Sequence, residues 1–374
     1  MLDGLHLTLL IGPTIPVPAP TQVIQALKSV QVTVGSGQRS GFQLAFALSK
    51  RSPLTNELIP LGYFDPGIRV IIVATVGAIP NVLIDGIITR QEVSASNDLG
   101  QSQVSVTGED VSVMMDLNDV VPKPFPAVPE AGRVAILVGL YAMYGLVPLI
   151  IPPIFSSVKP PTDSTPFQKG SDLAYINYLA KKAGYVFFIE PGPLPGMNIA
   201  YFGPEIRVGI PQPALNVNMD ALTNVNSLSF SFDGLSRKQY VILIQEPNTK
   251  IGIPIPLPSL DLLSPPLTLK QAPSLRWETL PDAAKLNPVE ALGQGLAKAL
   301  ESSDAVSGSG EVDVIRYGQP LKARSLVGVR GAGLAYDGLY YVKSVTHNIK
   351  AGEYKQSFTL ARNGLIPLTP LVPT

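Results

Sequence analysis

Apolar and polar residues alternate with a period of two between Val30 and Asp116, and this pattern constrains the fold more than any other feature. Successive strand residues point to opposite faces of a sheet, so the pattern predicts strands with one buried face. Strands fit residues 41–49, 68–76, 82–96 and 102–113, with Gly, Pro and Asn-Asp turns between them. Strands that follow one another across short turns predict an antiparallel barrel or sandwich. In the first of these strands the shared apolar side consists of Phe42, Leu44, Phe46 and Leu48.

The first twenty residues resemble a secretory signal superficially, but they lack a basic start and carry Asp3. Their apolar run is broken by prolines at 13, 16 and 18, and leucines alternate with His6 and Thr8. We therefore expect a strand of the mature protein at this end.

A different texture follows residue 120. Residues 121–130 contain four prolines and are typical of a connector. The stretch Val134–Phe155 has no charged residue, which would suit a membrane helix, but its prolines end any helix after about fourteen residues. We expect a core helix there, an extended segment from Val147, and no membrane span.

A second helix is predicted over residues 171–183, with Ser171 or Gly170 as its cap and Gly184 as its stop. Its predicted apolar stripe contains Leu173, Ile176, Tyr178 and Leu179. Residues 185–190 then predict a strand.

Strand patterns return after Asn216. They cover 228–232, 240–246, 312–318, 325–331, 339–349 and 354–362. Residues 251–273 are too rich in proline for a central strand, and their Ile and Leu content favours a packed arm over a solvated loop. Residues 288–302 predict an amphipathic helix, and residues 302–311 predict a flexible linker. The two sheet segments are too dissimilar in sequence to establish a repeat.

Charge excludes one class of function. The chain has 28 basic and 28 acidic residues among 374, without a basic cluster. Binding to phosphate backbones needs clustered Lys and Arg, so we expect no nucleic-acid binding. A weakly charged, apolar composition indicates that partner proteins cover much of the surface, although a sheet-rich domain with polar, uncharged loops would have the same composition.

The residues that carry most enzyme chemistry are scarce. No cysteine is present, and the only histidines are His6 and His347, which we interpret as ordinary strand residues. No nucleophile elbow or phosphate-binding loop occurs. Glu109 and Asp110 form the only tight acidic pair of the first sheet, and we expect them to be solvated. We therefore predict no catalytic, cofactor-binding or metal-binding residue and no cofactor.

Three segments resemble the phage late-control D family, in the same order along nearly the whole chain. They are LHLTLLIGPTIPVPAP with the SGFQLAF strand, residues 168–204, and the run YDGLYYVKSVTHNIKAGEYKQSFTLARNGL at 336–365. The resemblance carries no catalytic motif.

The resemblance implies the central hub of a baseplate, as in contractile phage tails, extracellular injection particles and the hub part of type VI secretion spikes. It implies a homotrimer whose subunits each hold two tube-like antiparallel β-barrel domains, so that six similar units surround a channel. Expected partners are a separate spike protein, because no spike repeat follows Leu365, the inner tube ring and other baseplate proteins. Assembly in the cytoplasm and residence on a virion or extracellular particle follow from the same resemblance.

The predicted fold is therefore mainly β, with two barrels flanking a mixed α/β module. We expect domains at 1–120, 121–215 and 216–374, with an insertion at about 246–311. The alternative functions are a particle-associated cell-wall hydrolase, which would need a catalytic cluster, and a glycan-binding β-protein, which would rely on tyrosines because Trp277 is the only tryptophan.

Overall fold

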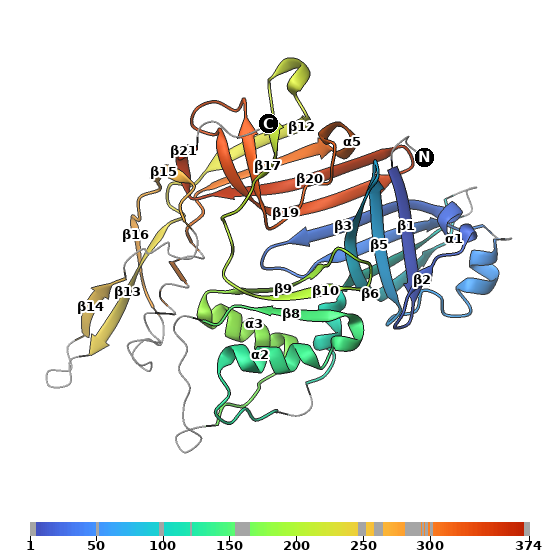
Figure 1. Cartoon of the computed structure of the whole chain (residues 1–374), viewed down its shortest axis with the longest axis horizontal. Helices are drawn as coiled ribbons and strands as arrows, with labels where there is room; N and C mark the ends of the chain where they lie inside the picture. The colour runs from blue at the N-terminus through green and yellow to red at the C-terminus, as the bar shows by residue number, and fades with distance from the viewer. Residues whose placement is uncertain are drawn as a thin grey trace.

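The computed structural model describes residues 5–49, 52–96, 101–119, 122–153, 165–245, 252–257, 265–280, 293, 295, 298–299 and 302–369. Its main feature is a 13-stranded sheet with the order β12-β17-β20-β19-β3-β4-β7-β6-β5-β1-β2, to which β18 and β11 attach beside β19 (Figure 1). The predicted mainly-β class with a mixed α/β module is confirmed. The two sheet segments were expected as separate barrels, but β3 pairs with β19 and joins them into one sheet. Among the described strands, no pair closes either half into a ring.

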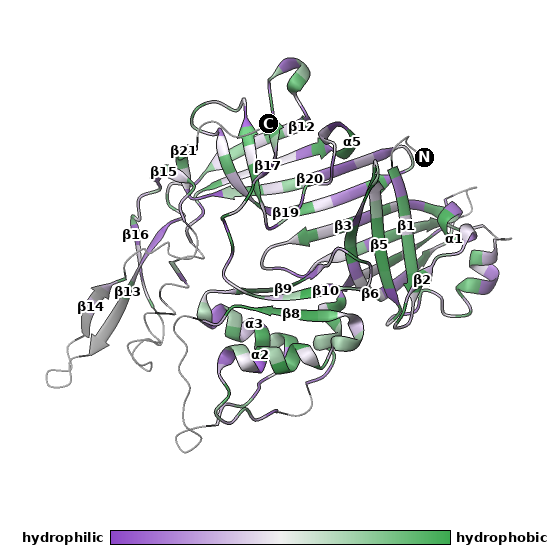
Figure 2. Cartoon of the chain, in the orientation of Figure 1, coloured by the Kyte–Doolittle hydropathy of each residue, from purple (hydrophilic) through white to green (hydrophobic). Residues whose placement is uncertain are grey.

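The N-terminal half of the sheet follows the predicted alternation. Phe42, Leu44 and Phe46 are buried, as are the facing residues of the neighbouring strands. Strand β5 is apolar along most of its length, because both of its faces are covered (Figure 2). The elements are β1 (Leu5–Gly12), β2 (Val17–Pro18), α1 (Thr21–Ala26), β3 (Leu27–Gly35), β4 (Gly41–Ala47), a helical turn (Leu54–Leu58), β5 (Arg69–Val76), β6 (Ile79–Ser94), β7 (Gln103–Asp110) and the turn η2 (Val111–Met115).

The middle module packs two helices on one side of the small sheet β8-β10-β9 (Figure 1). Helix α3 begins where predicted, because the Ser171 hydroxyl accepts a hydrogen bond from the Ala174 N–H, and it ends at Gly184 in the left-handed conformation. The predicted apolar stripe is wrong at Tyr178, whose side chain is exposed. Tyr175, three residues earlier in the helix, is buried instead. The elements are α2 (Glu130–Gly139), a 3-10 turn (Ala142–Tyr144), β8 (Leu146–Ile150), α3 (Asp172–Ala183), β9 (Val186–Pro191) and β10 (Asn198–Gly203). Within the described residues, no helix is long and apolar enough to cross a membrane.

The C-terminal half corrects two expectations. Residues 302–311 were predicted to be a flexible linker, but most of them form β17, a central strand between β12 and β20. Glycines in β17 leave room for aromatic rings of the neighbouring strands: a Cβ on Gly310 would lie 2.7 Å from the Phe358 ring. Residues 240–246 were assigned to this sheet, but strand β13 lies outside it and pairs with β14 and β16. The elements are β11 (Gln212–Asn216), a 3-10 turn (Asp220–Leu222), β12 (Val225–Phe232), β13 (Lys238–Gln245), β17 (Val306–Asp313), α5 (Val314–Tyr317), β18 (Leu326–Arg330), β19 (Gly338–Lys350), β20 (Glu353–Arg362) and β21 (Gly364–Pro367).

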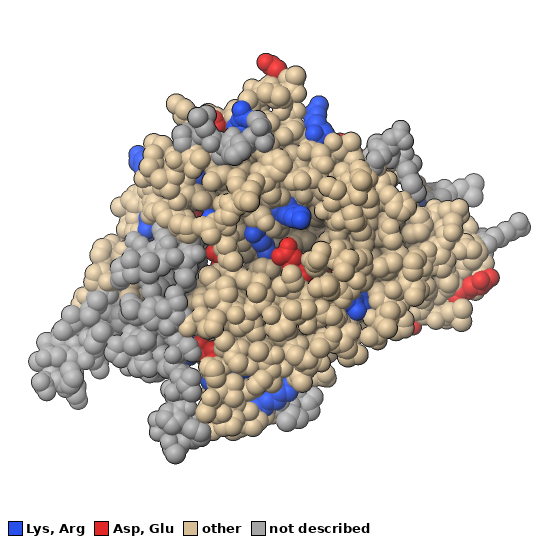
Figure 3. All heavy atoms as spheres, viewed as in Figure 1, with Lys and Arg blue, Asp and Glu red and all other residues tan. Residues whose placement is uncertain are grey.

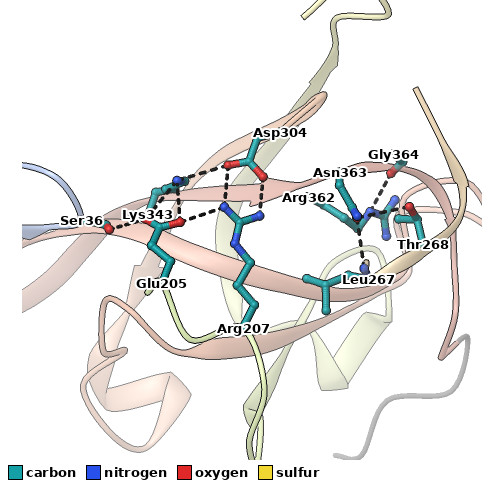
Figure 4. Close-up of polar contacts among 10 residues, drawn as sticks. All are labelled: Ser36, Glu205, Arg207, Leu267, Thr268, Asp304, Lys343, Arg362, Asn363 and Gly364. Carbon is teal, nitrogen blue, oxygen red and sulfur yellow. Dashed lines mark hydrogen bonds and ion pairs between the residues drawn. The ribbon is translucent and has the colours of Figure 1, made fainter. Parts of the chain in front are cut away.

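The insertion is partly ordered into short strands, β14 (Gly252–Pro256), β15 (Thr268–Gln271) and β16 (Arg276–Thr279). Strand β15 pairs with β21, and the side chain of Asn363 accepts hydrogen bonds from the Leu267 N–H and the Thr268 hydroxyl (Figure 4). This part of the insertion therefore packs on its own chain. Of the helix predicted over 288–302, the described residues 293, 295, 298 and 299 are helical and Ser302 lies in a turn; the rest of the range lies outside the described residues.

Candidate functional site

One face of the long sheet is polar, with uncharged side chains near the join and charged ones such as Arg90, Glu311 and Lys355 farther along the strands, and the opposite face is the apolar core. Strand registers place serines, threonines and amides side by side across the join between the two halves. Their side chains hydrogen-bond across neighbouring strands, with donor–acceptor distances of 2.6–3.3 Å. We call this surface the polar face; the side chains that bond across it are those of Gln31, Thr33, Gln43, Ser105, Ser229, Ser309, Ser344, Thr346, Asn348 and Thr359.

The two halves of the sheet repeat the same strand order. In the N-terminal half, β3, β4, β5, β6 and β7 take the spatial order β3-β4-β7-β6-β5, and in the C-terminal half β12, β17, β18, β19 and β20 take the order β12-β17-β20-β19-β18. Every neighbouring pair in both series is antiparallel. The two series therefore match strand by strand, both along the chain and in space.

The match extends to an irregularity at one position. The pairing register shifts after Ile88 in β6, and it shifts after Val342 in β19. The Ile88 N–H donates to the Ile68 carbonyl and its carbonyl accepts from the Gly67 N–H, both at 2.8 Å. Val342 makes the same two bonds, to the Ser325 carbonyl at 2.9 Å and from the Arg324 N–H at 2.8 Å.

The backbone at this irregularity agrees as well. Gly67 has a φ of +97°, and Arg324, which takes its place in the second half, has a φ of +60° although it is not glycine. Equivalent bulges with equivalent left-handed residues indicate that the halves are an internal repeat.

A partly buried ionic cluster joins four parts of the chain (Figure 4). Arg207, from the segment after β10, contacts Asp304 and Glu205, with one hydrogen bond of 2.9 Å to each carboxylate. Lys343 of β19 lies 3.2 Å from both carboxylates, and the Ser36 hydroxyl donates to Glu205. The cluster therefore fixes the turn after β3, the segment after β10, the segment before β17 and β19 to one another.

The cluster holds both of its acids ionised. Burial alone would raise the pKa of Glu205, but Lys343, Arg207 and Ser36 outweigh burial and lower that pKa. Burial would also raise the pKa of Asp304, and Arg207 and Lys343 lower it in the same way. Both directions indicate a structural ion network, not a carboxylic acid that is ready to donate a proton.

A second junction joins the first half of the sheet to the middle module. The Arg69 guanidinium donates two hydrogen bonds to Asp85, of 2.8 and 2.7 Å, and one of 2.7 Å to the Tyr144 carbonyl. Asn198 of β10 donates to the same Asp85 carboxylate at 2.9 Å. Asp85 was not among the predicted site residues, although a carboxylate inside the apolar run VLIDGII is a visible signal.

The two histidines lie on strands, as predicted. His6 is exposed on β1, and His347 is buried on β19. The Nδ1 atom of His347 lies 3.2 Å from the Gln356 amide nitrogen, which can only donate, and 2.8 Å from the Tyr354 hydroxyl. Nδ1 is therefore an acceptor, and the imidazole is neutral.

Burial lowers the pKa of His347 to about 4. The unfolded chain takes up this proton as pH falls through about 6.5, but the folded chain does not, so stability is lost between about pH 6.5 and 4. We expect His347→Gln to flatten this part of the stability profile by about 1.4 kcal/mol per pH unit. Urea denaturation of both proteins at several pH values measures this slope. Parallel profiles for the two proteins would contradict the prediction, and His6→Gln is the exposed control.

The acidic pair of the first sheet is not solvated as expected. Asp110 is buried, and its carboxylate accepts hydrogen bonds from the Ser40 and Ser112 N–H groups at 2.7 and 3.0 Å. It caps the turn η2, whereas Glu109 points the other way and pairs with Arg39 at 2.9 Å. Asp110 was expected to be solvated because the sequence does not show that β7 ends at this residue. A carboxylate caps a helical turn only when it stands directly before that turn. The described residues contain no group of three or more His, Asp and Glu side chains arranged to hold a metal ion.

The face drawn in Figure 3 bears few charges, and the hollow in it shows both signs. A cavity of about 300 Å³ is lined by Glu205, Arg324, Tyr341 and the segment after β10. This segment exposes Ile206, Val208 and Ile210, which are 46%, 60% and 96% accessible. Three exposed branched residues on one extended segment are typical of a contact surface for another protein.

No protein-family model matches the chain, and no curated protein matches it in sequence. Solved structures do match its fold. The tail protein from Neisseria meningitidis MC58 matches with a TM-score of 0.65 at 12% identity, over 97% of this chain and 98% of that one. The 43 kDa tail protein of prophage MuSo2 from Shewanella oneidensis matches with a TM-score of 0.60 at 13% identity, over 96% and 98%.

A third match is the E. coli c3393 protein, described as a component of the type VI secretion system with structural similarity to the T4 bacteriophage tail proteins gp27 and gp5. Its TM-score is 0.53 at 10% identity, over 93% of this chain and 77% of that one. The chain therefore has a fold found in phage tail proteins and in a type VI secretion component.

Proposed function

We propose that this chain is the baseplate hub of a contractile phage tail or injection system, of the late-control D type, and that it acts as a structural homotrimer without enzymatic activity. The internal repeat is the observation that supports this proposal most, because three copies of a chain with two equivalent half-sheets supply six equivalent units. Such a ring meets a three-fold spike on one side and a six-fold tube on the other. The fold shared with tail proteins over nearly the whole chain supports this proposal.

Three domains would carry out this role, at 1–120, 121–215 and 216–374. Three hydrophobic clusters support the division: one in the N-terminal half of the sheet, one in the middle module and one in the C-terminal half. The half-sheets would form the ring and receive the first tube ring. The middle modules, with Ile206, Val208 and Ile210, would contact other baseplate proteins.

The polar face would line the channel. The side chains near its join are uncharged and already hydrogen-bond to one another, and charged residues of both signs, such as Arg90, Glu311 and Lys355, lie farther along the same face. Such a surface stays hydrated and attracts cargo of neither charge strongly. The particle would assemble in the cytoplasm, with the spike as a separate chain.

Negative-stain electron microscopy of the purified chain, alone and co-expressed with its candidate spike, tests the proposal. We expect rings with three-fold symmetry, six lobes and a central channel. Compact single particles without a channel in both samples would contradict it. Peptidoglycan cleavage or a glycan-array signal from such particles would then favour the hydrolase or the glycan-binding protein.

A further inference from the structure

In each half of the sheet, one strand edge lacks the partner strand that its equivalent has in the other half. Within the chain the halves are joined by the second part of β19, Ser344–Lys350, which pairs with β3. The equivalent of β19 is β6, whose residues from Arg90 onward pair with β7 on one edge and with no described strand on the other. The equivalent of β3 is β12, which pairs with β17 and has a free outer edge among the described strands.

Both free edges are accessible. Apart from the half-buried Gln91, every residue of β6 from Arg90 to Ser94 is exposed, as are Ala95 and Ser96. Strand β12 exposes Ser227, Ser229, Ser231 and Phe232. An unpaired strand edge presents N–H and C=O groups that can extend a sheet by another strand.

The chain itself supplies the register for that pairing. In the first half, Ile88 of β6 lies opposite Gly108 of β7, Gly108 lies opposite Phe42 of β4, and Phe42 lies opposite Val32 of β3. In the second half, Val342 of β19 lies opposite Leu360 of β20, Leu360 lies opposite Gly308 of β17, and Gly308 lies opposite Phe230 of β12. Phe230 therefore takes the place of Val32, and Val93 takes the place of His347, since each lies five residues after the equivalent bulge.

We infer that β6 of one copy pairs antiparallel with β12 of the next copy, with Val93 opposite Phe230, as His347 lies opposite Val32 within the chain. This inference rests on the proposed trimer and specifies its contact. The junction is head-to-tail, so a rotation that closes after three copies gives a ring with three internal and three intermolecular joins of one geometry.

The side chains brought together by this register are complementary. On the apolar side, Val93, which is 57% exposed, meets Phe230, and Ala95 meets Leu228. On the polar side, Ser94 meets Ser229 and Arg90 meets Asp233. The last pair is an opposite-charge cross-strand pair, in which Asp233 is exposed and Arg90 has a side chain 70% exposed. A shift by one residue would place Arg90 opposite Phe232 and turn the apolar residues to the polar side.

Cysteine cross-linking tests the register, because the native chain has no cysteine. Ser94 and Ser229 correspond to Asn348 and Gln31, whose side chains hydrogen-bond directly at 3.1 Å. The Ser36 N–H donates to the Lys343 carbonyl, which places this pair among the non-hydrogen-bonded pairs, where side chains are closest. That spacing suits a disulfide.

We expect the full chain with Ser94→Cys and Ser229→Cys to run mainly as a covalent trimer on a non-reducing gel after mild oxidation. The matched control is Ser94→Cys with Ser309→Cys, because Ser309 is exposed on the same face but lies one strand farther, beside Ser229. It should stay at least tenfold less cross-linked. Each single variant can form no species larger than a dimer.

Light scattering of the unmodified chain distinguishes a wrong strand register from a wrong oligomeric state. A trimer in solution whose Ser94→Cys/Ser229→Cys variant does not cross-link would overturn the β6–β12 register and leave the hub proposal standing. Covalent ladders beyond the trimer would overturn the closed ring. A monomer without cross-links would overturn both.

Discussion

Replacing Arg207 with Met is expected to destabilise the chain by about 3–5 kcal/mol, because it leaves buried carboxylates without their main counter-charge. Arg207 is 5% exposed and bonds Glu205 and Asp304, whose side chains are 19% and 22% exposed. Lys343 would then be the one cation of the cluster left to pair with both Glu205 and Asp304. The melting temperature, followed by circular dichroism at pH 7, should fall by about 5–10 °C.

The matched control is Lys355→Met, which removes a partly exposed cation that pairs with Glu353 on the sheet surface. Exposed pairs contribute little, so this change should leave the melting temperature close to that of the native chain. Adding Glu205→Gln and Asp304→Asn to Arg207→Met should recover part of the loss, because the uncompensated charges are its cause. If Arg207→Met and Lys355→Met melted alike, the cluster would not stabilise the junction.

The pH dependence of this variant has a defined sign. The folded chain lowers the pKa of Glu205 and Asp304, so their stabilisation is present above the ordinary carboxyl pKa values and is lost as pH falls through the lowered ones. The difference between the native chain and Arg207→Met should therefore be constant near neutral pH and shrink below about pH 4. A difference that grows in acid would contradict this account.

The sequence predicts local structure well where the pattern is governed by neighbours along the chain. The alternation in β4 and the Ser171 cap with the Gly184 stop of α3 are both found. A strand needs only its own period of two, and a helix start needs only its own cap. These features therefore follow from a few adjacent residues.

Features governed by distant residues could not be predicted in this way. Residues 302–311 have the composition of a linker, and they form a strand because Phe230 and Phe358 fill the space above Gly308 and Gly310. The repeat is equally hidden, because it lies in the position of a bulge and in the conformations of Gly67 and Arg324. Equivalent backbones with different side chains leave little trace in one sequence.

The ionic junctions were missed for the same reason. Glu205 and Arg207 are neighbours in one segment, but Asp304 and Lys343 are far from it along the chain, and no spacing relates them. Asp85 is different, because a carboxylate within an apolar strand must find a partner when it is buried. The sequence could therefore have identified Asp85 as a buried charge, although not Arg69 as its partner.

Replacing Asp85 with Ala is expected to cost about 3–5 kcal/mol, since Arg69 would keep its charge in a buried site. Asp85 is 1% exposed and Arg69 is 3% exposed, so water cannot take the place of the lost carboxylate. Asn198 would lose one acceptor as well. The middle module should therefore loosen from the first half of the sheet, and limited proteolysis should cut it faster than in the native chain.

A double-mutant cycle distinguishes this junction from ordinary core packing. Asp85→Ala together with Arg69→Met removes both charges, so the double variant should be more stable than the sum of the single losses by about 2 kcal/mol or more. Asp119→Ala, at an exposed carboxylate, should change neither stability nor proteolysis. Additive losses from the two substitutions would mean that Arg69 and Asp85 act independently. The middle module would then be held to the sheet by apolar contacts and not by this ion pair.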